Sequence, residues 1–311
     1  MPPSSHARSE TAPLDSYVKS WSPAPVTDED PLHADPVVAL SAVLDLPAPA
    51  VRAGDAIPPL WHWLYFLHWT AQRDLGPDGH PLHGHFLPPV PNRQRMWAGG
   101  RCEIVEPLRL GEPAERVSSL SAVTTKHGRT GELLFVTERR EFRQGGRVRL
   151  VEEQDIVYRS GRNAAQHPDA LDESAAPEPD APWQLPFRAT PALLFGFSAL
   201  TANAHRIHYD APYCRDEEGY PGLVVHGPLL ALLMLELPRR QAPERPVRSL
   251  SYRLRRPVFA GERVSAYGTP DGTGAGPSAG LSAGPSAGPS AELSVATHRE
   301  TRHATAEVVF G

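Results

Sequence analysis

The segment from Gly227 to Leu237 (GPLLALLMLEL) is the feature that most constrains how this chain can fold. Pro228 suits the first position of a helix and Pro238 stands close to its end, so a helix is predicted here. Apolar residues cover all sides of that helix. A helix of this kind must be enclosed, and a sheet curled around one central helix encloses it with few elements. The pattern therefore predicts an α+β fold.

Short segments with alternating apolar and polar residues follow this helix, between residues 247 and 310. They read VRSLSYRLRRPVF, ERVSAYG, ELSVATHRE and HATAEVVF, and we expect strands there. A run of Ala, Gly, Ser and Pro at residues 270–291 interrupts them and indicates a low-complexity loop, to which we assign no function. Residues 183–311 are therefore predicted to form one domain, a sheet around a central helix.

Residues 35–160 repeat the same order of an apolar segment, a helix and strands. The aromatic segment from Pro58 to Leu75 begins with Pro and ends before a Gly, which predicts a second long helix. Alternating segments with Gly-containing breaks follow it and indicate an antiparallel meander. Residues 161–182, rich in Ala, Pro and acidic side chains, are expected to link the two domains. Residues 1–34 are polar and Pro-rich, so we expect a mobile end that packs only locally.

The composition limits the classes of partner that the chain could have. Of its 311 residues 40% are hydrophobic, the formal net charge is -5, and the basic residues are scattered, which argues against nucleic-acid binding. No stretch approaches the roughly 20 apolar residues of a membrane helix, and the first residues lack the apolar region of a signal peptide. The sequence therefore predicts a soluble, cytoplasmic protein without membrane contact. Cys102 and Cys214 are the only cysteines, and we expect both to be free thiols.

The segment FSALTANAHRIHYD, residues 197–210, stands shortly before His226 and Gly227 at the start of the predicted helix. A helix start offers unpaired N–H groups and the positive end of a dipole, and Gly lets a ligand approach the backbone closely. A thioester carbonyl that becomes an enolate needs such a donor. A neutral imidazole at His208 could take a proton from water, and the amide of Asn203 could hold that water. Together these groups would suffice to add water across an activated double bond.

This arrangement resembles the MaoC-like hydratase/dehydratase family, in the branch with two fused hot-dog domains. That branch includes itaconyl-CoA and mesaconyl-C4-CoA hydratases and the type 2 hydroxyacyl-thioester dehydratases. The segments PPLWHWLYF, GPDGHP, FLPPVP, RMWAGG and EEQDIVYR in the first half are similar to the same branch. The broader family has Asp, any, Asn, Pro, any, His, any, Asp. Here His208 and Asp210 match the last part, Asn203 stands in place of the catalytic Asp, and His205-Arg206 replace Asn-Pro.

The resemblance implies a tandem hot-dog fold, in which each half is a curved antiparallel sheet wrapped around a central helix. It implies a catalytic C-terminal half and an N-terminal half on the acyl-pocket side. The implied reaction is reversible hydration of an enoyl-CoA to a 3-hydroxyacyl-CoA, without a metal or redox cofactor, on a substrate carried by CoA or an acyl carrier protein. His208 is then expected to be the general acid/base, Asn203 to orient the water and the Gly227 N–H to stabilise the enolate. The residues expected to bind substrate are His226, Arg206, Asp210 and Arg253.

Three other interpretations remain open at this point. His205, His208, Asp210 and His226 could together hold a metal ion, since imidazoles and carboxylates are good ligands. An acyl-CoA thioesterase on the same fold would attack the thioester carbonyl, although Glu236 lies too far along the helix to serve it. A non-catalytic acyl-thioester-binding subunit is the third, because a fold does not fix a function.

The sequence leaves the substrate itself open. It does not give the acyl chain, the choice between CoA and a carrier protein, the physiological direction or the oligomeric state, for which a homodimer is one option. A dicarboxylic acyl chain would need a cation in the acyl pocket. Arg206, Arg253 and Arg255 are the candidates that the sequence offers for this cation.

Overall fold

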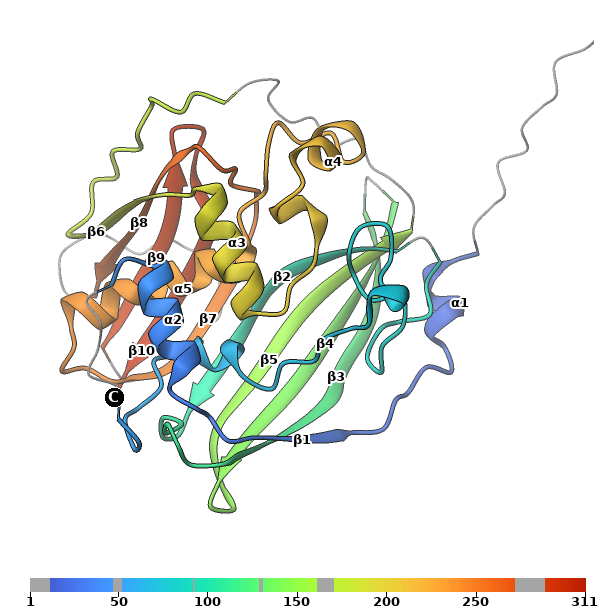
Figure 1. Ribbon diagram of the computed structural model, residues 1–311, viewed down its shortest axis with the longest axis horizontal. Coiled ribbons are helices and arrows are strands. Elements are labelled where there is room, and N and C mark those ends of the chain that lie inside the picture. The colour runs from blue at the N-terminus through green and yellow to red at the C-terminus, as the bar shows by residue number, and fades with distance from the viewer. Residues whose placement is uncertain (1–11, 47–51, 92, 129–130, 161–170, 272–288) are drawn as a thin grey trace, which may run out of the picture.

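The computed structural model describes residues 12–46, 52–91, 93–128, 131–160, 171–271 and 289–311. Their strands form a ten-stranded antiparallel sheet in the order β1-β3-β4-β5-β2-β7-β10-β9-β8-β6 (Figure 1). The strands are β1 (Val26–Asp30), β2 (Arg93–Ile104), β3 (Ala114–Gly128), β4 (Gly131–Gln144), β5 (Arg147–Ser160), β6 (Trp183–Arg188), β7 (Val247–Leu254), β8 (Arg263–Pro270), β9 (Ser290–Thr297) and β10 (Glu300–Phe310). The strands β1 to β5 form one half of the sheet and β6 to β10 the other.

The two halves repeat one arrangement. In each half the first long strand, β2 or β7, lies at the centre of the sheet. The next three strands follow outward in the reverse of their chain order, and β1 and β6 form the two edges. The halves meet where β2 pairs with β7, and Cys102 there faces Leu250. Each edge strand is followed by a helix, α2 (Asp35–Val43) or α3 (Pro191–Leu200), and these two helices pack against each other. The chain is thus built as two linked copies of one unit, as the sequence predicts.

The long helix α5 (Gly227–Gln241) is the centre of the C-terminal half. Its residues from Leu229 to Pro238 are all buried, and it packs against β6, β7, β8, β9 and β10. Figure 1 shows it crossing these strands. Burying a Leu side chain contributes about 2 kcal/mol, so an apolar helix of this kind gains most of its stability from being enclosed. The predicted central helix of the second domain is confirmed.

The N-terminal half lacks such a helix among its described residues, so the helix predicted from Pro58 to Leu75 is wrong. That segment contains only two short 3-10 helices, η1 (Trp61–Leu64) and η2 (Gln72–Asp74). Leu60 and Phe66 have positive φ values of 68° and 56°, which a helix cannot include. The Asp30 carboxylate of the edge strand β1 accepts a hydrogen bond from the Phe66 N–H at 2.8 Å. A contact from a distant segment therefore sets the backbone that the local pattern assigns to a helix.

Residues 12–34 differ from the expectation of an end that packs only locally. The helix α1 (Leu14–Val18) buries Leu14 beneath β3 and β4, and β1 pairs with β3 along its whole length. Residues 1–11, 161–170 and 272–288 lie outside the described residues, and with them part of the predicted end, the first ten of the 22 residues of the predicted linker and most of the low-complexity loop. The described part of the linker, residues 171–182, contains no helix or strand.

Two further expectations concern the chain as a whole. Cys102 and Cys214 are both free and buried, as predicted. None of the helices in the described ranges is long and apolar enough to cross a membrane.

Candidate functional site

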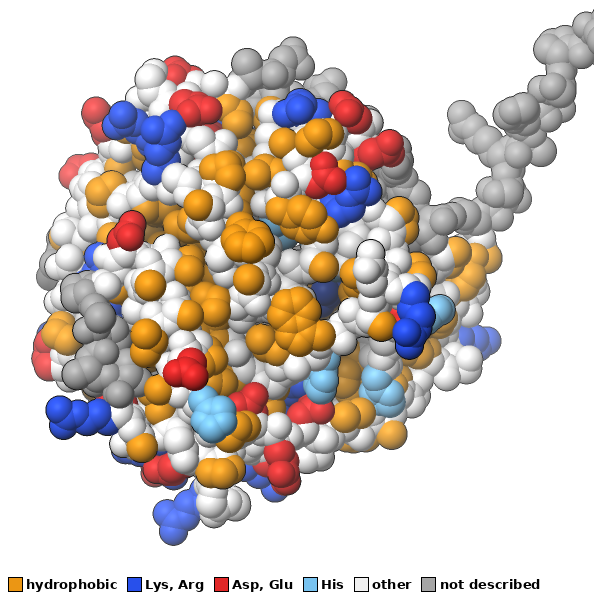
Figure 2. All heavy atoms as spheres, viewed as in Figure 1, with side chains coloured by type: hydrophobic (Ala, Val, Ile, Leu, Met, Phe, Trp, Pro, Cys, Tyr) orange, Lys and Arg blue, Asp and Glu red, His pale blue; other side chains and the backbone are white. Residues whose placement is uncertain are grey.

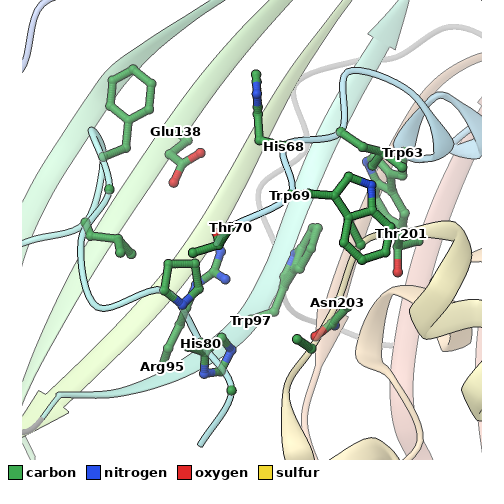
Figure 3. Close-up of a pocket in the computed structure, with 18 of the residues that line it drawn as sticks. Trp63, His68, Trp69, Thr70, His80, Arg95, Trp97, Glu138, Thr201 and Asn203 are labelled. Carbon is green, nitrogen blue, oxygen red and sulfur yellow. The ribbon is translucent and has the colours of Figure 1, made fainter. Parts of the chain in front are cut away.

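A cavity of about 1290 Å³ opens between the two halves. In the C-terminal half α5 covers the inner face of the sheet, whereas the N-terminal half has no comparable helix in its described part, so β2, β3 and β4 face open space. On the face of the molecule seen in Figure 2, apolar side chains gather across the middle and charged side chains lie mainly near the edges. Residues of both halves line the cavity, and several of them are labelled in Figure 3. They include Trp63, Asp78, His80, Arg95, Trp97, Thr201, Asn203 and Pro228.

Asn203 reaches this cavity from the turn that ends α3. Ala202 adopts a left-handed conformation with a φ of 49°, and the Asn203 N–H then donates to the carbonyl of Ser198 at 2.9 Å. The Oδ1 atom of Asn203 accepts a hydrogen bond from the His205 N–H at 3.0 Å. Because its oxygen is engaged, Asn203 offers its NH₂ group to a ligand or a water molecule.

His208 ends the short helix η3 (Arg206–His208) and is buried. Its Nδ1 lies 2.7 Å from the carbonyl oxygen of Val224. A carbonyl only accepts, so Nδ1 carries the proton and Nε2 of the neutral ring is free to accept one. Burial, and after it the neighbouring His205, lower the pKa of His208 to about 3, against a smaller opposing effect of the Val224 carbonyl. The ring is therefore neutral at pH 7, as a proton acceptor must be.

The start of α5 lies next to this ring. His226 precedes the helix, and the ring of His208 stacks on the ring of His226 with 3.6 Å between their centroids. Pro228 has no N–H, so Gly227 and Leu229 supply the free amides of the first turn. A Cβ on Gly227 would lie 2.3 Å from Cδ1 of Leu254 on β7, so this position accepts no side chain unless Leu254 moves. The structure thus brings Asn203, His208 and Gly227 to one corner of the molecule.

Four imidazoles form a continuous row through this corner. From His226 and His208 the row continues to His205, whose ring centroid lies 5.4 Å from that of His208, and then to His80, 3.9 Å from His205. Burial, and then the charge of His80, lower the pKa of His205 to about 2, although Asp78 opposes this. Burial and then His208 hold the pKa of His226 well below its ordinary value. His226 Nε2 lies 2.8 Å from the Ser198 hydroxyl. The inner part of the row is therefore uncharged at neutral pH.

The outer end of the row comes from the N-terminal half. The Nδ1 atom of His80 lies 2.9 Å from the Asp78 carboxylate, and the Arg206 N–H donates to the Asp78 carbonyl at 2.8 Å. Between them Gly79 has a φ of +87°, and a Cβ there would lie 1.9 Å from the carbonyl oxygen of Ala204. Burial raises the pKa of Asp78, but hydrogen bonds from His80 and its charge outweigh this and lower it below its ordinary value. Only glycine fits between the two halves at this contact.

The metal set considered from the sequence, His205 with His208, Asp210 and His226, is not the group that the described residues bring together. Ligand atoms of Asp78, His80 and His205 instead lie within 4.8 Å of one another. In this group the Asp78 carboxylate is hydrogen-bonded to His80, and the ring of His80 is tilted by 37° on the ring of His205. As it stands, the cluster is a hydrogen-bonded pair packed on a third ring.

Residues 60–260 of this chain match the family model described as hydroxyacyl-thioester dehydratase type 2. The chain belongs to this family. It is 45% identical to the mesaconyl-C(4)-CoA hydratase of Chloroflexus aurantiacus over 240 residues, which cover 74% of this chain and 81% of that protein. It is 27% identical to the mitochondrial hydroxyacyl-thioester dehydratase type 2 of Schizosaccharomyces pombe over 271 residues, 77% of this chain and 88% of that protein. The resemblance to MaoC-like hydratases and dehydratases is thereby confirmed.

Solved structures of low sequence identity share the fold. HtdX of Mycobacterium tuberculosis superposes with a TM-score of 0.60 at 17% identity and covers 92% of this chain and 99% of its own. A MaoC-like dehydratase of Phytophthora capsici reaches a TM-score of 0.63 at 13% identity, over 96% of this chain and 99% of its own. The hot-dog fold class is therefore confirmed, with the N-terminal half departing from it in the long helix.

Arg206, Asp210 and Arg253, which were also expected to bind substrate, have other surroundings. Arg206 donates to the Asp210 carboxylate at 2.7 and 3.0 Å and to the Pro77 carbonyl at 2.8 Å. The Asp210 side chain also accepts the Tyr213 N–H at 3.1 Å, which begins the helix α4 (Ala211–Asp216). Arg253 is exposed on β7. None of the three is among the residues that line the cavity, and the same holds for His208, His226 and Gly227, whereas Asn203 and Pro228 line it.

Two cavity residues, Asp78 and His80, were not identified from the sequence, and a third, Arg95, was considered there only as a border of the acyl or CoA channel and not as a site residue. All come from the N-terminal half, within the segments GPDGHP and RMWAGG that carry the family resemblance. An Asp two residues before a His, with a Gly between them, is a local signal for a carboxylate-imidazole pair. Their place beside Asn203 depends on how the two halves pack, which sequence spacing does not show.

Proposed function

We propose that this chain reversibly hydrates an enoyl thioester to a 3-hydroxyacyl thioester. One observation carries the proposal: the neutral His208 ring, fixed by Val224, stacks on His226 at the start of α5, and Asn203 and the helix residue Pro228 line the cavity. Both curated relatives are named as enzymes of this chemistry, one a hydratase and one a dehydratase. The substrate would be carried on CoA or an acyl carrier protein.

In the proposed reaction each group has one task. The thioester carbonyl would accept the Gly227 N–H at the helix start, which stabilises the enolate that forms when a nucleophile adds to the β-carbon. The Asn203 NH₂ group would hold the attacking water, and Nε2 of His208 would take its proton. The hydroxyl joins the β-carbon, and the proton passes from His208 to the α-carbon. No metal or redox cofactor enters this scheme.

We assign the supporting roles by position. The row of histidines places His226 behind His208, where its ring fixes the plane of the catalytic imidazole. His80, oriented by Asp78, covers His205 and acts as a positioning residue from the other half. The domain from residue 183 to residue 311 would be the catalytic one, and the domain from 35 to 160 would form most of the acyl pocket. The cytoplasmic location and a homodimer stay predictions from the sequence, and the fission yeast relative is named as mitochondrial.

Loss of enoyl-thioester absorbance measures the proposed activity directly. We expect His208→Ala to lower kcat at least about a hundredfold, because general acid/base groups typically contribute that much. The matched control is His127→Ala, whose side chain on β3 is 77% exposed, and it should retain wild-type turnover. Unchanged turnover in His208→Ala would remove this ring from the mechanism.

Two rival functions give different results with the same reagents. A thioesterase would release free thiol, which a disulfide reagent detects, without forming a 3-hydroxyacyl product. A binding subunit would retain acyl-CoA with neither signal. Hydration by the wild-type protein without thiol release would exclude both.

A further inference from the structure

The cavity contains three guanidinium groups, and two of them have a carboxylate partner. Arg116 pairs with Asp28 at 2.7 Å, and Arg140 pairs with Glu138 at 2.7 Å. Arg95 has neither an ion pair nor a side-chain hydrogen bond with any of the residues that the structure describes, and its Nε atom is buried without a partner. A buried donor without a partner costs free energy, and a buried charge costs more. The cavity therefore contains a cation, the Arg95 guanidinium, whose hydrogen-bond donors are free to bind a ligand.

Arg95 lines the wall of the cavity that would receive the acyl chain of the proposed substrate. It faces the cavity from β2, two residues before Trp97, and pairs in the sheet with Tyr158. The Trp97 indole donates to the Gly99 carbonyl at 3.1 Å and to the Tyr252 hydroxyl at 3.0 Å, which fixes this wall. Figure 3 shows Arg95, Trp97 and Asn203 around the same space, Arg95 from one half and Asn203 from the other. The cavity thus combines aromatic walls with one uncompensated cation near the site of water addition.

The chemical group that fits this cation is a carboxylate. Guanidinium presents a planar fork of donors that matches the two oxygens of a carboxylate. The phosphates of CoA would also attract it, but the whole pantetheine arm separates them from the thioester. The positive charge of Arg95 contributes, after burial and His80, to lowering the pKa of His205, whose ring neighbours the proposed base His208. A carboxylate on the acyl chain itself would lie near the thioester and could therefore reach Arg95.

We propose that Arg95 binds a second carboxylate on the acyl chain, so that the substrate class is a dicarboxylic enoyl thioester. The inference rests on the proposed hydration activity and adds its specificity. It assigns to Arg95 the role that the sequence offered to Arg206, Arg253 or Arg255. The mesaconyl group in the name of the Chloroflexus relative is an acyl group of this class, an unsaturated one with a free carboxylate next to the β-carbon.

Two thioesters that differ only at this group test the proposal. Mesaconyl-C4-CoA carries a carboxylate on its β-carbon, and 3-methylcrotonyl-CoA carries a methyl group in the same place. We expect the wild-type protein to prefer the first, and Arg95→Gln to reduce that preference, the ratio of the two kcat/KM values, by roughly a hundredfold, the usual effect of losing charge-assisted hydrogen bonds. Arg95→Lys should restore part of it. Arg101→Gln, on the same strand but 52% exposed and paired with Glu153, should leave the ratio unchanged.

Calorimetric binding of the same thioesters and of free CoA separates this proposal from the proposed function. If the wild-type protein hydrates neither thioester but still binds mesaconyl-C4-CoA more tightly, and Arg95→Gln removes that difference, the carboxylate site stands and the hydratase assignment fails. If hydration proceeds but Arg95→Gln leaves the ratio unchanged, the carboxylate site is wrong. An equal loss of affinity for free CoA in Arg95→Gln would place the contact on the CoA phosphates and also overturn it.

Discussion

The strands β2 to β5 and the strands β7 to β10 lie in mirrored order around one seam, each set preceded by an edge strand and a short helix. In the C-terminal copy α5 fills the inner face of the sheet, and its first turn carries the donors of the proposed site. In the N-terminal copy two 3-10 turns stand where that helix would be, and the space they leave is the cavity. The same arrangement of strands can therefore hold either a helix whose start takes part in the proposed reaction or a cavity with room for a substrate.

The polar interiors of the two copies differ as well. The C-terminal copy buries uncharged imidazoles, His208 and His226, beside its helix. The N-terminal copy buries a carboxylate beside its aromatic segment: fully buried Glu152 lies 3.2 Å from His62 and accepts the Trp63 indole N–H at 2.6 Å. The two interiors should therefore respond differently to acid and to mutation.

Acid should test the C-terminal interior most severely. The folded-state pKa values of His208 and His226 lie below the ordinary value of 6.5, about 3 for His208, so the unfolded chain binds protons first as the pH falls. Each ring then removes up to about 1.4 kcal/mol of stability per pH unit below 6.5 and has no effect above it. From pH 6.5 to pH 4.5 His208 alone should lower the free energy of unfolding by about 2 kcal/mol, and His226 should lower it further in the same direction. Denaturant titrations across this range measure it, and a flat profile would show that the rings are charged in the folded protein.

Removing the carboxylate of the N-terminal interior should have the next largest effect. Burial raises the pKa of Glu152, but His62 and then Arg140 outweigh it and lower the pKa to about 2. Glu152→Ala leaves His62 and Trp63 without this partner, and we expect a loss of about 4 kcal/mol in the free energy of unfolding, as for other broken buried pairs. Glu152→Gln keeps an acceptor for the indole and should lose less. Equal stability of wild type and Glu152→Ala would mean that the copy does not depend on this pair.

The smallest expected effect concerns the point where the copies touch. His80→Ala should lower kcat about tenfold, equivalent to about 1.4 kcal/mol, because His205 loses the ring that positions it. The same change should move the acidic limb of the pH-rate profile to higher pH, since His80 covers His205 and its charge lowers the pKa of that residue. A purely structural role would leave the limb in place. His127→Ala serves again as the control.

The features that the sequence predicts lie mainly in the C-terminal copy, and those that it does not predict lie mainly in the N-terminal copy. The α5 helix and the strands that follow it are visible because their burial pattern is local. The neighbourhood of Asn203, His208 and Gly227 was predicted from the family resemblance, and the packing brings these residues to one corner. The aromatic segment after Pro58 misleads, because the Asp30 contact to Phe66 comes from another strand. The Asp78–His80 pair was missed, and Arg95 was considered only as a border of the acyl or CoA channel, for a similar reason: their neighbours come from the packing of the two copies and not from the local sequence.

The close approach of Gly79 to Ala204 has a consequence for the charge of the site. A C-terminal copy cut free of its partner would expose His205 to water, and hydration would return its imidazole to ordinary protonation near neutral pH. Tethering the two copies in one polypeptide therefore does more than shape a pocket, because it keeps a proton off the ring that neighbours the proposed base.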